Sequence, residues 1–105
     1  MSARTLPDGF PLLTARAEIP SHVVYRAFVH ETVVLNLETG MYHGLNPTGG
    51  RMLEVLEREH SVDGAVASLA EEYAKPADEV ERDVCEFCVD LFERGLIEIS
   101  PNGRH

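Results

Sequence analysis

The sequence predicts a small α+β domain in which a three-stranded antiparallel meander precedes three helices. Residues 22–45 alternate apolar and polar side chains between short turns, which is typical of strands. Residues 46–95 instead repeat apolar side chains every three to four positions between helix-start and helix-stop residues. Because each element must bury its apolar side, we expect the helices to cover the apolar face of the sheet.

The length and composition indicate one globular domain without a membrane span. The chain has 105 residues, of which 44% are hydrophobic, and no run of 18 apolar residues occurs. The N-terminal MSARTLPDGF lacks the apolar stretch of a secretory signal. Two cysteines without such a signal favour free thiols in a reducing compartment. We therefore expect a cytoplasmic protein without a membrane partner.

The charge of the chain is strongly acidic and uneven. The net charge is −9: residues 1–50 carry three basic and four acidic side chains, and residues 51–105 carry six and fourteen. Such a surface repels phosphate backbones, which counts against a nucleic-acid partner. It suits a basic or mixed-charge partner, although acidic helix faces that keep a small domain in solution explain it equally well.

The ends of the chain read differently from its middle. Residues 1–20 contain three of the six prolines, which disfavour long strands or helices. We expect an N-terminal arm (1–20) with a short strand around residues 12–17, a folded domain (21–99) and a flexible tail (100–105). Residues 96–99 are apolar and are expected to pack as a short tail.

Three strands are predicted in residues 22–45. In the first, HVVYRAFV, one face carries Val23, Tyr25, Ala27 and Val29. After a tight connection at His30-Glu31, the second strand, TVVLNL, has Val33, Leu35 and Leu37 on one face. Residues 38–40 form a turn whose glycine can take a positive φ, and residues 41–45 return as the third strand.

Capping residues predict where the three helices begin and end. Asn46-Pro47 starts the first helix, which runs to about Glu59, and Ser61 starts the second. The third runs from about Pro76 to Arg94, with Gly95 as its stop. Glycine in a helix costs about 1 kcal/mol relative to alanine. We therefore expect the glycine pair at 49–50 to allow a close backbone approach.

The third helix and the third strand together predict a peptide site. At 100° per residue, the apolar arc of the helix spans about 200°, wider than a surface helix needs. Residues 41–45 carry no lysine or proline, the usual protection of an edge strand. An extended peptide could therefore add there as a fourth strand. Coverage of the helix by its neighbours, and of the edge by the N-terminal arm, are the plainer alternatives.

Three stretches occur in the order and spacing of a known family. They are LNLETGMYHGLNPTGGRMLEVLE, SVDGAVASLAEEY and EVERDVCEFCVDLFERGLIE. Residues 22–99 thereby resemble the small proteins related to pyrroloquinoline quinone synthesis protein D. These PqqD-like proteins are also called RiPP recognition elements or peptide-modification chaperones.

The resemblance implies a winged helix-turn-helix-like domain that binds the leader segment of a ribosomal precursor peptide. It implies an adaptor without catalysis or cofactor, acting with a maturation enzyme such as a radical SAM enzyme, a leader peptidase or a cyclase. In the family the leader adds antiparallel to the third strand and lies against the third helix. Carried over, the peptide-binding residues are Met41, Tyr42, His43, Gly44, Leu45, Val80, Asp83, Val84 and Phe87. Asp83 is expected to pair with a leader lysine or arginine, unless it is an ordinary solvated carboxylate.

Other functional classes have weaker support. Cys85 and Cys88 form a C-x-x-C match, but they lie inside a helix and no second ligand pair exists, so core cysteines are favoured over metal or redox chemistry. No catalytic triad or phosphate-binding glycine loop is recognisable. A winged-helix DNA-binding regulator fits the helix order but not the acidic third helix. Strand exchange by the arm leaves a homodimer open.

Overall fold

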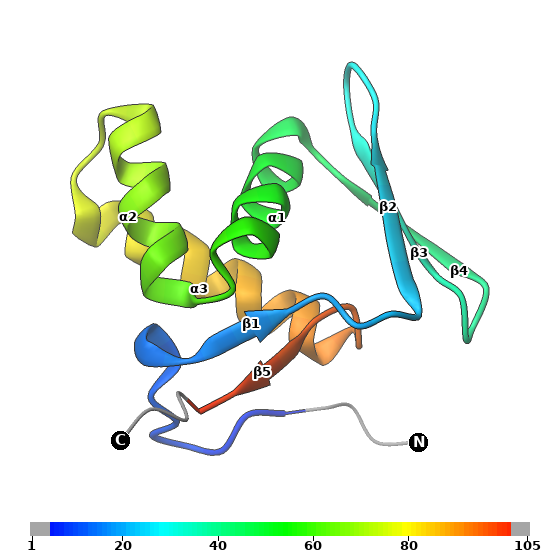
Figure 1. Ribbon diagram of the computed structural model, residues 1–105, viewed down its shortest axis with the longest axis horizontal. Helices are drawn as coiled ribbons and strands as arrows, with labels where there is room; N and C mark the ends of the chain where they lie inside the picture. Colours follow the sequence, from blue (N-terminus) through cyan, green and yellow to red (C-terminus); the bar gives the residue numbers. More distant parts are fainter. Residues whose placement is uncertain (1–4, 102–105) are drawn as a thin grey trace.

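The computed structural model describes residues 5–101 and confirms the predicted order of a three-stranded antiparallel meander followed by three helices (Figure 1). A 3-10 turn and one short strand precede the meander, and one short strand follows the last helix. The elements are η1 (Leu12–Thr14), β1 (Arg16–Glu18), β2 (Val23–Ala27), β3 (Thr32–Asn36), β4 (Met41–Leu45), α1 (Pro47–Glu59), α2 (Val62–Tyr73), α3 (Ala77–Glu93) and β5 (Glu98–Ser100).

Two tight connections set the register of the main sheet, whose order is β2-β3-β4. The Phe28 N–H donates to the Glu31 carbonyl over 2.7 Å and closes the first hairpin. In the second, Gly40 takes a φ of +75°, as glycine readily does. The buried Asn36 accepts bonds from the backbone N–H groups of Glu38 and Thr39 through its side-chain oxygen, which satisfies this polar group.

The face of the sheet that meets the helices differs from the sequence expectation. On β3 the buried side chains are Thr32, Val34 and Asn36, so Val33 and Leu35 point away from the helices. The expectation that the helices cover the more apolar set is wrong for this strand. Alternation fixes which residues share a face, but not which face is buried. Val29, grouped with the first strand, lies exposed in the loop after β2.

The start of α1 packs closely against β3, as the glycine pair predicts. The Asn46 side chain accepts a bond of 2.7 Å from the Gly49 N–H and caps the helix. A Cβ at Gly50 would overlap the Thr32 hydroxyl and lie 2.9 Å from the Thr32 Cβ. Glycine at position 50 therefore lets the helix backbone approach the sheet.

A half-buried tyrosine ties β2 to the last turn of α1. The Tyr25 hydroxyl donates to the Glu57 carboxylate over 2.5 Å. Burial, and then this carboxylate, raise the pKa of the hydroxyl well above its usual value. Tyr25 thus remains the hydrogen-bond donor across the neutral range.

Two further helix ends, the start of α2 and the end of α3, follow the predicted signals. Ser61 accepts a bond from the Gly64 N–H at the start of α2. After α3, Gly95 takes a φ of +77°, and the Leu96 N–H returns to the Leu91 carbonyl over 2.9 Å. This arrangement closes the helix end and turns the chain toward β5.

The segments at the two ends of the described chain pair with each other. β1 and β5 form a two-stranded antiparallel sheet, with Ala17 opposite Ile99 (Figure 1). Ala15 and Ala17 also bond to the turn between α1 and α2 and are buried in the core. The strand expected around residues 12–17 begins later, at Arg16, because residues 12–14 form η1. Residues 1–4 of the expected arm and 102–105 of the expected tail lie outside the described range.

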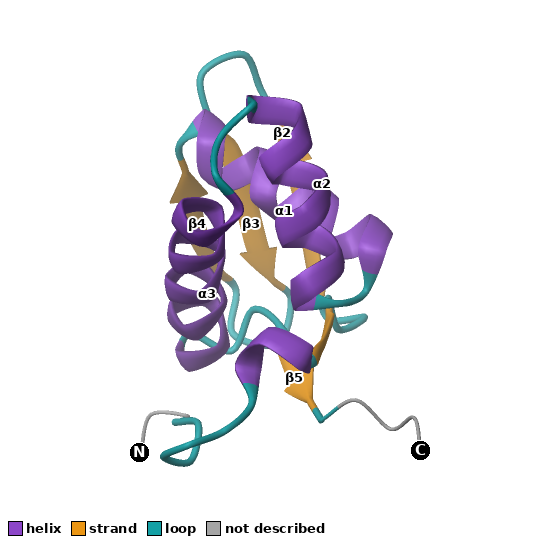
Figure 2. Cartoon of the chain, turned by 90° about the vertical axis from the view of Figure 1, so that its left-hand side faces the viewer, coloured by secondary structure: helices purple, strands orange, loops and turns teal. Residues whose placement is uncertain are grey.

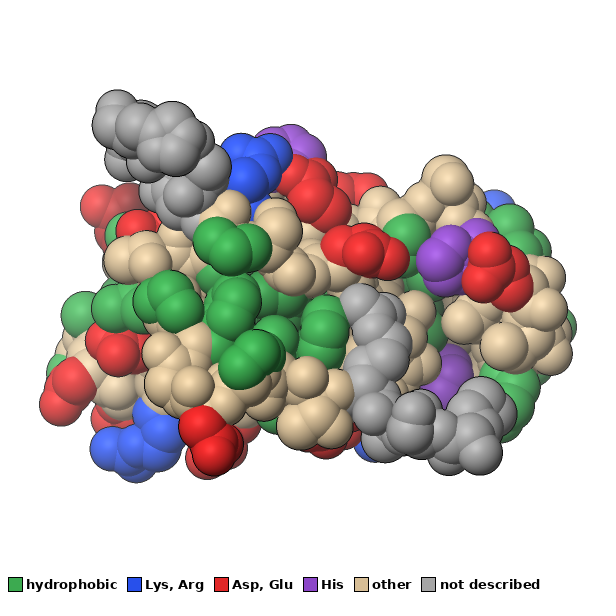
Figure 3. All heavy atoms as spheres, turned by 90° about the horizontal axis from the view of Figure 1, so that it is seen from below, with side chains coloured by type: hydrophobic (Ala, Val, Ile, Leu, Met, Phe, Trp, Pro, Cys, Tyr) green, Lys and Arg blue, Asp and Glu red, His purple; other side chains and the backbone are tan. Residues whose placement is uncertain are grey.

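The apolar core lies between the helices and is closed by the N-terminal segment and the residues after α3. Seen from below in Figure 3, apolar side chains gather in the left half of the face, with acidic side chains at their margin. Leu12 and Leu13 of η1 are half-buried and pack against the core. Within residues 5–101, no helix has the length and apolar character required to cross a bilayer.

Candidate functional site

The free edge of β4 is the first component of the site. β4 is the last strand of the sheet, with Tyr42 opposite Leu35 and His43 opposite Val34 on β3. Among residues 5–101 no strand pairs with its other edge, and the N-terminal segment pairs with β5 instead. Because successive residues of a strand direct their backbone groups to opposite edges, β4 offers N–H and C=O groups to an added strand.

A groove separates this edge from α3. Figure 2 shows α3 in front of β4 on the same side of the molecule. The hollow between them has a volume of about 260 Å³. Gly49 lies at the base of this hollow. A Cβ at this position would lie 3.4 Å from the Phe87 ring, so the glycine lets the ring come close to the backbone of α1. The lining residues are Gly44, Leu45, Asn46, Gly49, Met52, Phe87, Asp90 and Arg94.

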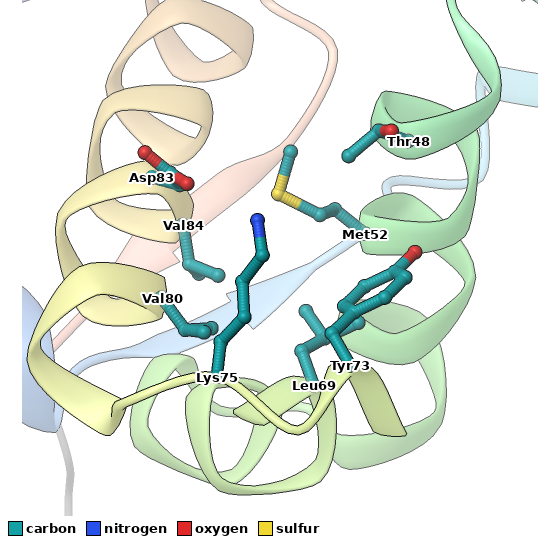
Figure 4. Close-up of a pocket in the computed structure, with 8 residues that line it drawn as sticks. All are labelled: Thr48, Met52, Leu69, Tyr73, Lys75, Val80, Asp83 and Val84. Atoms are coloured by element: carbon teal, nitrogen blue, oxygen red, sulfur yellow. The ribbon is translucent and has the colours of Figure 1, made fainter. Parts of the chain in front are cut away.

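A second hollow of about 110 Å³ lies where the three helices meet (Figure 4). Its apolar surface comes from Leu69, Val80 and Val84. Thr48, Tyr73, Lys75 and Asp83 supply polar atoms, and the Lys75 side chain reaches into the hollow between α3 and Tyr73. Met52 lines both hollows, so the two lie on either side of this side chain.

The predicted site residues divide between these places. Gly44, Leu45 and Phe87 come together in the groove. Val80, Asp83 and Val84 line the second hollow. Tyr42, opposite Leu35, lies on the sheet face that points away from the helices, and half-buried His43 lies on the other face. Met41 is 58% exposed and lines neither hollow. The β4 residues therefore share a strand edge with free backbone groups, and their side chains do not share one pocket.

Several lining residues were not anticipated from the sequence. Asp90 and Arg94 form an i,i+4 ion pair of 3.0 Å along α3. Asp90 and Arg94 follow Asp83 and Phe87 at intervals of three or four residues, which places all four on one side of α3. This spacing could have predicted them from the sequence. Lys75 enters from the turn between α2 and α3, and Met52 from the exposed edge of α1. Their places depend on how the helices pack, which no local pattern reveals.

The two cysteines belong to the core side of α3. Cys88 is buried, and burial with a smaller effect of Cys85 raises its thiol pKa to about 12. Burial, and then Glu81, also raise the pKa of Cys85. Both thiols are therefore protonated at neutral pH, whereas a redox thiol requires a lowered pKa. In residues 5–101 no group of three or more histidine, cysteine or acidic side chains could hold a metal ion.

The geometry defines a class of protein: a small α+β domain in which the free edge of the last sheet strand lies beside an amphipathic helix, with a groove between them. The chain belongs to the PqqD family, since the family described as coenzyme PQQ synthesis protein D (PqqD) matches residues 31–97. No curated protein sequence matches the chain.

Two solved structures share the fold. The chain is similar to TbiB1 in complex with the TbiA(beta) leader peptide, with 32% identity and a TM-score of 0.70 over 84% of this chain and 98% of that chain. It is also similar to a lasso peptide synthetase B1 complexed with the leader peptide. That likeness has 23% identity and a TM-score of 0.69 over 79% of this chain and 98% of that chain, and it shows the fold alone.

Proposed function

We propose that this chain binds the leader segment of a ribosomally made precursor peptide, which adds as an antiparallel strand to the free edge of β4 and lies against α3. The observation that carries the proposal is that this edge faces Phe87 across an open groove. TbiB1, at 32% identity, has a structure in complex with a leader peptide, which supports the same role here.

The two components of the site would divide affinity and specificity. Backbone bonds to β4 supply affinity with little dependence on the peptide sequence. The hollows on either side of Met52 accept side chains and supply specificity. The exposed carboxylate of Asp83, at the rim of the second hollow, would meet a lysine or arginine of the leader. Of the site residues expected from the sequence, Met41–Leu45 act in this scheme through the strand edge. The α3 residues Val80, Asp83, Val84 and Phe87 act through the hollows.

The proposed role is binding, and the chemistry belongs to a separate maturation enzyme such as a radical SAM enzyme, a leader peptidase or a cyclase. This role requires access to newly made precursor, which favours a cytoplasmic location. A DNA-binding role is disfavoured, because α3 carries Glu79, Asp83, Glu86 and Asp90 on the side near the groove, and these carboxylates repel phosphates.

Fluorescence anisotropy of a labelled leader, taken from a precursor encoded beside this gene, tests the proposal. We expect saturable binding in the nanomolar to low-micromolar range, competed by unlabelled leader but not by core peptide. Proline at Tyr42 or at His43 should weaken binding at whichever position directs its N–H to the free edge.

Methylated peptides provide a matched control that leaves the protein unchanged. Two leaders are compared, each with a single N-methyl group, and the two methylated positions are adjacent in the bound segment. One leader loses an N–H that faces β4, and the other loses an N–H that faces away from β4. Strand addition predicts that one of the two loses affinity and the other keeps it. Equal affinities for both methylated leaders would rule out strand addition at β4.

A further inference from the structure

The outer face of the sheet, meaning the face of β2, β3 and β4 that points away from α1, is apolar and uncovered. Val24, Leu35 and Tyr42 lie in one row across the three strands, because Val24 pairs with Leu35 and Leu35 with Tyr42. Val24, Phe28 and Tyr42 are 45%, 58% and 70% exposed. With Val33 they surround a shallow hollow of about 340 Å³, and within residues 5–101 no element packs on it.

Arg26 gives this apolar face a positive charge in a chain that is acidic as a whole. It lies opposite Val33 in the neighbouring row and lines the same hollow. Of the ion pairs among residues 5–101, none involves Arg26, although the chain has a net charge of −9. Aromatic residues and arginine are the types enriched in protein interfaces. An arginine covered by a partner requires a carboxylate on that partner.

The size of the face argues against a stable dimer of this chain. Three strands of five residues cover roughly 250 Å², given a strand spacing of about 4.8 Å and a rise of about 3.4 Å per residue. A standard interface buries about 800 Å² per partner. The face therefore suits a partner that binds transiently or touches further surface.

The outer face continues into the proposed peptide site. A peptide strand paired with β4 lies next to Tyr42, and alternate peptide side chains point to the same side as Tyr42. The bound peptide would thus enlarge the outer face by one strand. A protein docked there touches both the sheet and the peptide.

We infer that the outer face docks the enzyme that acts on the bound peptide, through an apolar surface of that enzyme bearing a carboxylate opposite Arg26. This inference rests on the proposed function of the β4 edge. The enzyme then binds the peptide-loaded chain more tightly than the free chain, and by linkage it raises the affinity of the chain for the leader by the same factor.

The test measures affinity of the purified full chain for the purified maturation enzyme encoded with the precursor, with and without saturating leader. The variant is Arg26→Glu, and Arg82→Glu is the matched control. Arg82 is exposed on α3, takes part in no ion pair among the described residues and undergoes the same charge reversal. We expect Arg26→Glu to weaken enzyme binding by roughly tenfold or more. Arg82→Glu should leave it unchanged. Val24→Glu places a charge in the apolar part of the outer face and should also weaken enzyme binding.

Leader anisotropy on the same variants separates this inference from the proposed function. Unchanged leader affinity together with lost enzyme affinity in Arg26→Glu supports docking on the outer face. Equal enzyme affinity of the wild type and both outer-face variants overturns it, whatever the leader does. A concentration-dependent dimer in sedimentation velocity that Val24→Glu dissociates also overturns it, in favour of a second copy. Failure of the wild type to bind any leader counts against the β4 site instead. In that case the enzyme affinities of the wild type and the outer-face variants, measured without leader, still decide whether the enzyme docks on the outer face.

Discussion

The helices and the main sheet of this chain differ in what they bury. α1, α2 and α3 each contribute several fully buried apolar side chains, such as Leu56, Leu69 and Leu91. Of the apolar residues described in β2, β3 and β4, Val23 and Val34 are buried, while Val24, Met41 and Tyr42 are largely exposed. Stability is therefore concentrated in the helices, whereas the sheet leaves the edge of β4 and its outer face accessible to other molecules.

The largest effect should come from a cavity in the helical part. Leu56 is 1% exposed, and truncation of such a leucine to alanine typically costs about 2–5 kcal/mol. We expect Leu56→Ala to lower the free energy of unfolding by this amount, measured by urea denaturation followed by circular dichroism. Leu37→Ala, at a leucine beside the sheet that is 57% exposed, is the matched control and should change it little. Similar losses in both variants would contradict the contrast between helices and sheet.

The junction between the two regions should be the next most sensitive place. Gly50→Ala puts a Cβ against Thr32, and overpacking of this kind costs about 1–3 kcal/mol. The double variant Gly50→Ala/Thr32→Ala should lose less than the sum of the single variants, because the overlapping hydroxyl is gone. Gly44→Ala is a control, since its Cβ would meet only the end of the Glu31 side chain. Additive losses in the double variant would argue against the Gly50–Thr32 contact.

The buried thiol of α3 should make the helical part sensitive to alkaline pH. Burial holds the pKa of Cys88 at about 12, whereas an unfolded thiol ionises near 8.5. In this window the unfolded chain releases a proton that the folded chain keeps. Stability is thus fully present below about pH 8.5 and falls as the pH rises toward 12, by about 1.4 kcal/mol per unit at most.

Urea midpoints at pH 8 and pH 10 check this expectation. The wild type should lose more stability between the two than Cys88→Ala, which lacks the titrating group but shares every other one. An identical loss in the two proteins would show that another group carries the pH dependence.

Local signals explain why the sequence predicted the helices well. Asn46, Ser61 and Gly95 each act within one turn of the residues they cap, so the chain around them determines the boundary. The thiols illustrate the same point, because the position of Cys88 on the apolar side of α3 already indicated a core residue. Where structure follows from neighbouring residues, the sequence was sufficient.

Long-range contacts explain what the sequence could not predict. β1 pairs with β5 across about 80 residues, and although both short segments alternate apolar and polar side chains, alternation does not identify the partner of a strand. The second hollow brings Lys75 and Met52 together through the packing of three helices. The face of β3 is a further case, because close approach of Gly50 selects Thr32, not Val33, for the buried side.

The smallest effect should separate the two faces of the sheet by one chemical change. Val→Thr keeps the shape of the side chain and adds a hydroxyl. Val34→Thr, 1% exposed, places that hydroxyl in the core and should cost about 1–3 kcal/mol. Val24→Thr, 45% exposed, leaves the hydroxyl in water and should change stability by less than about 0.5 kcal/mol.

This pair also tests why the more apolar residues of β3 face outward. If Val24→Thr costs as much as Val34→Thr in urea denaturation, the outer face is buried in solution and the contrast between the faces fails. If it costs little, those apolar side chains contribute little to folding. Their exposure then has its explanation in a contact with another protein, because a sheet face that serves only solubility would carry polar residues at Val24, Leu35 and Tyr42.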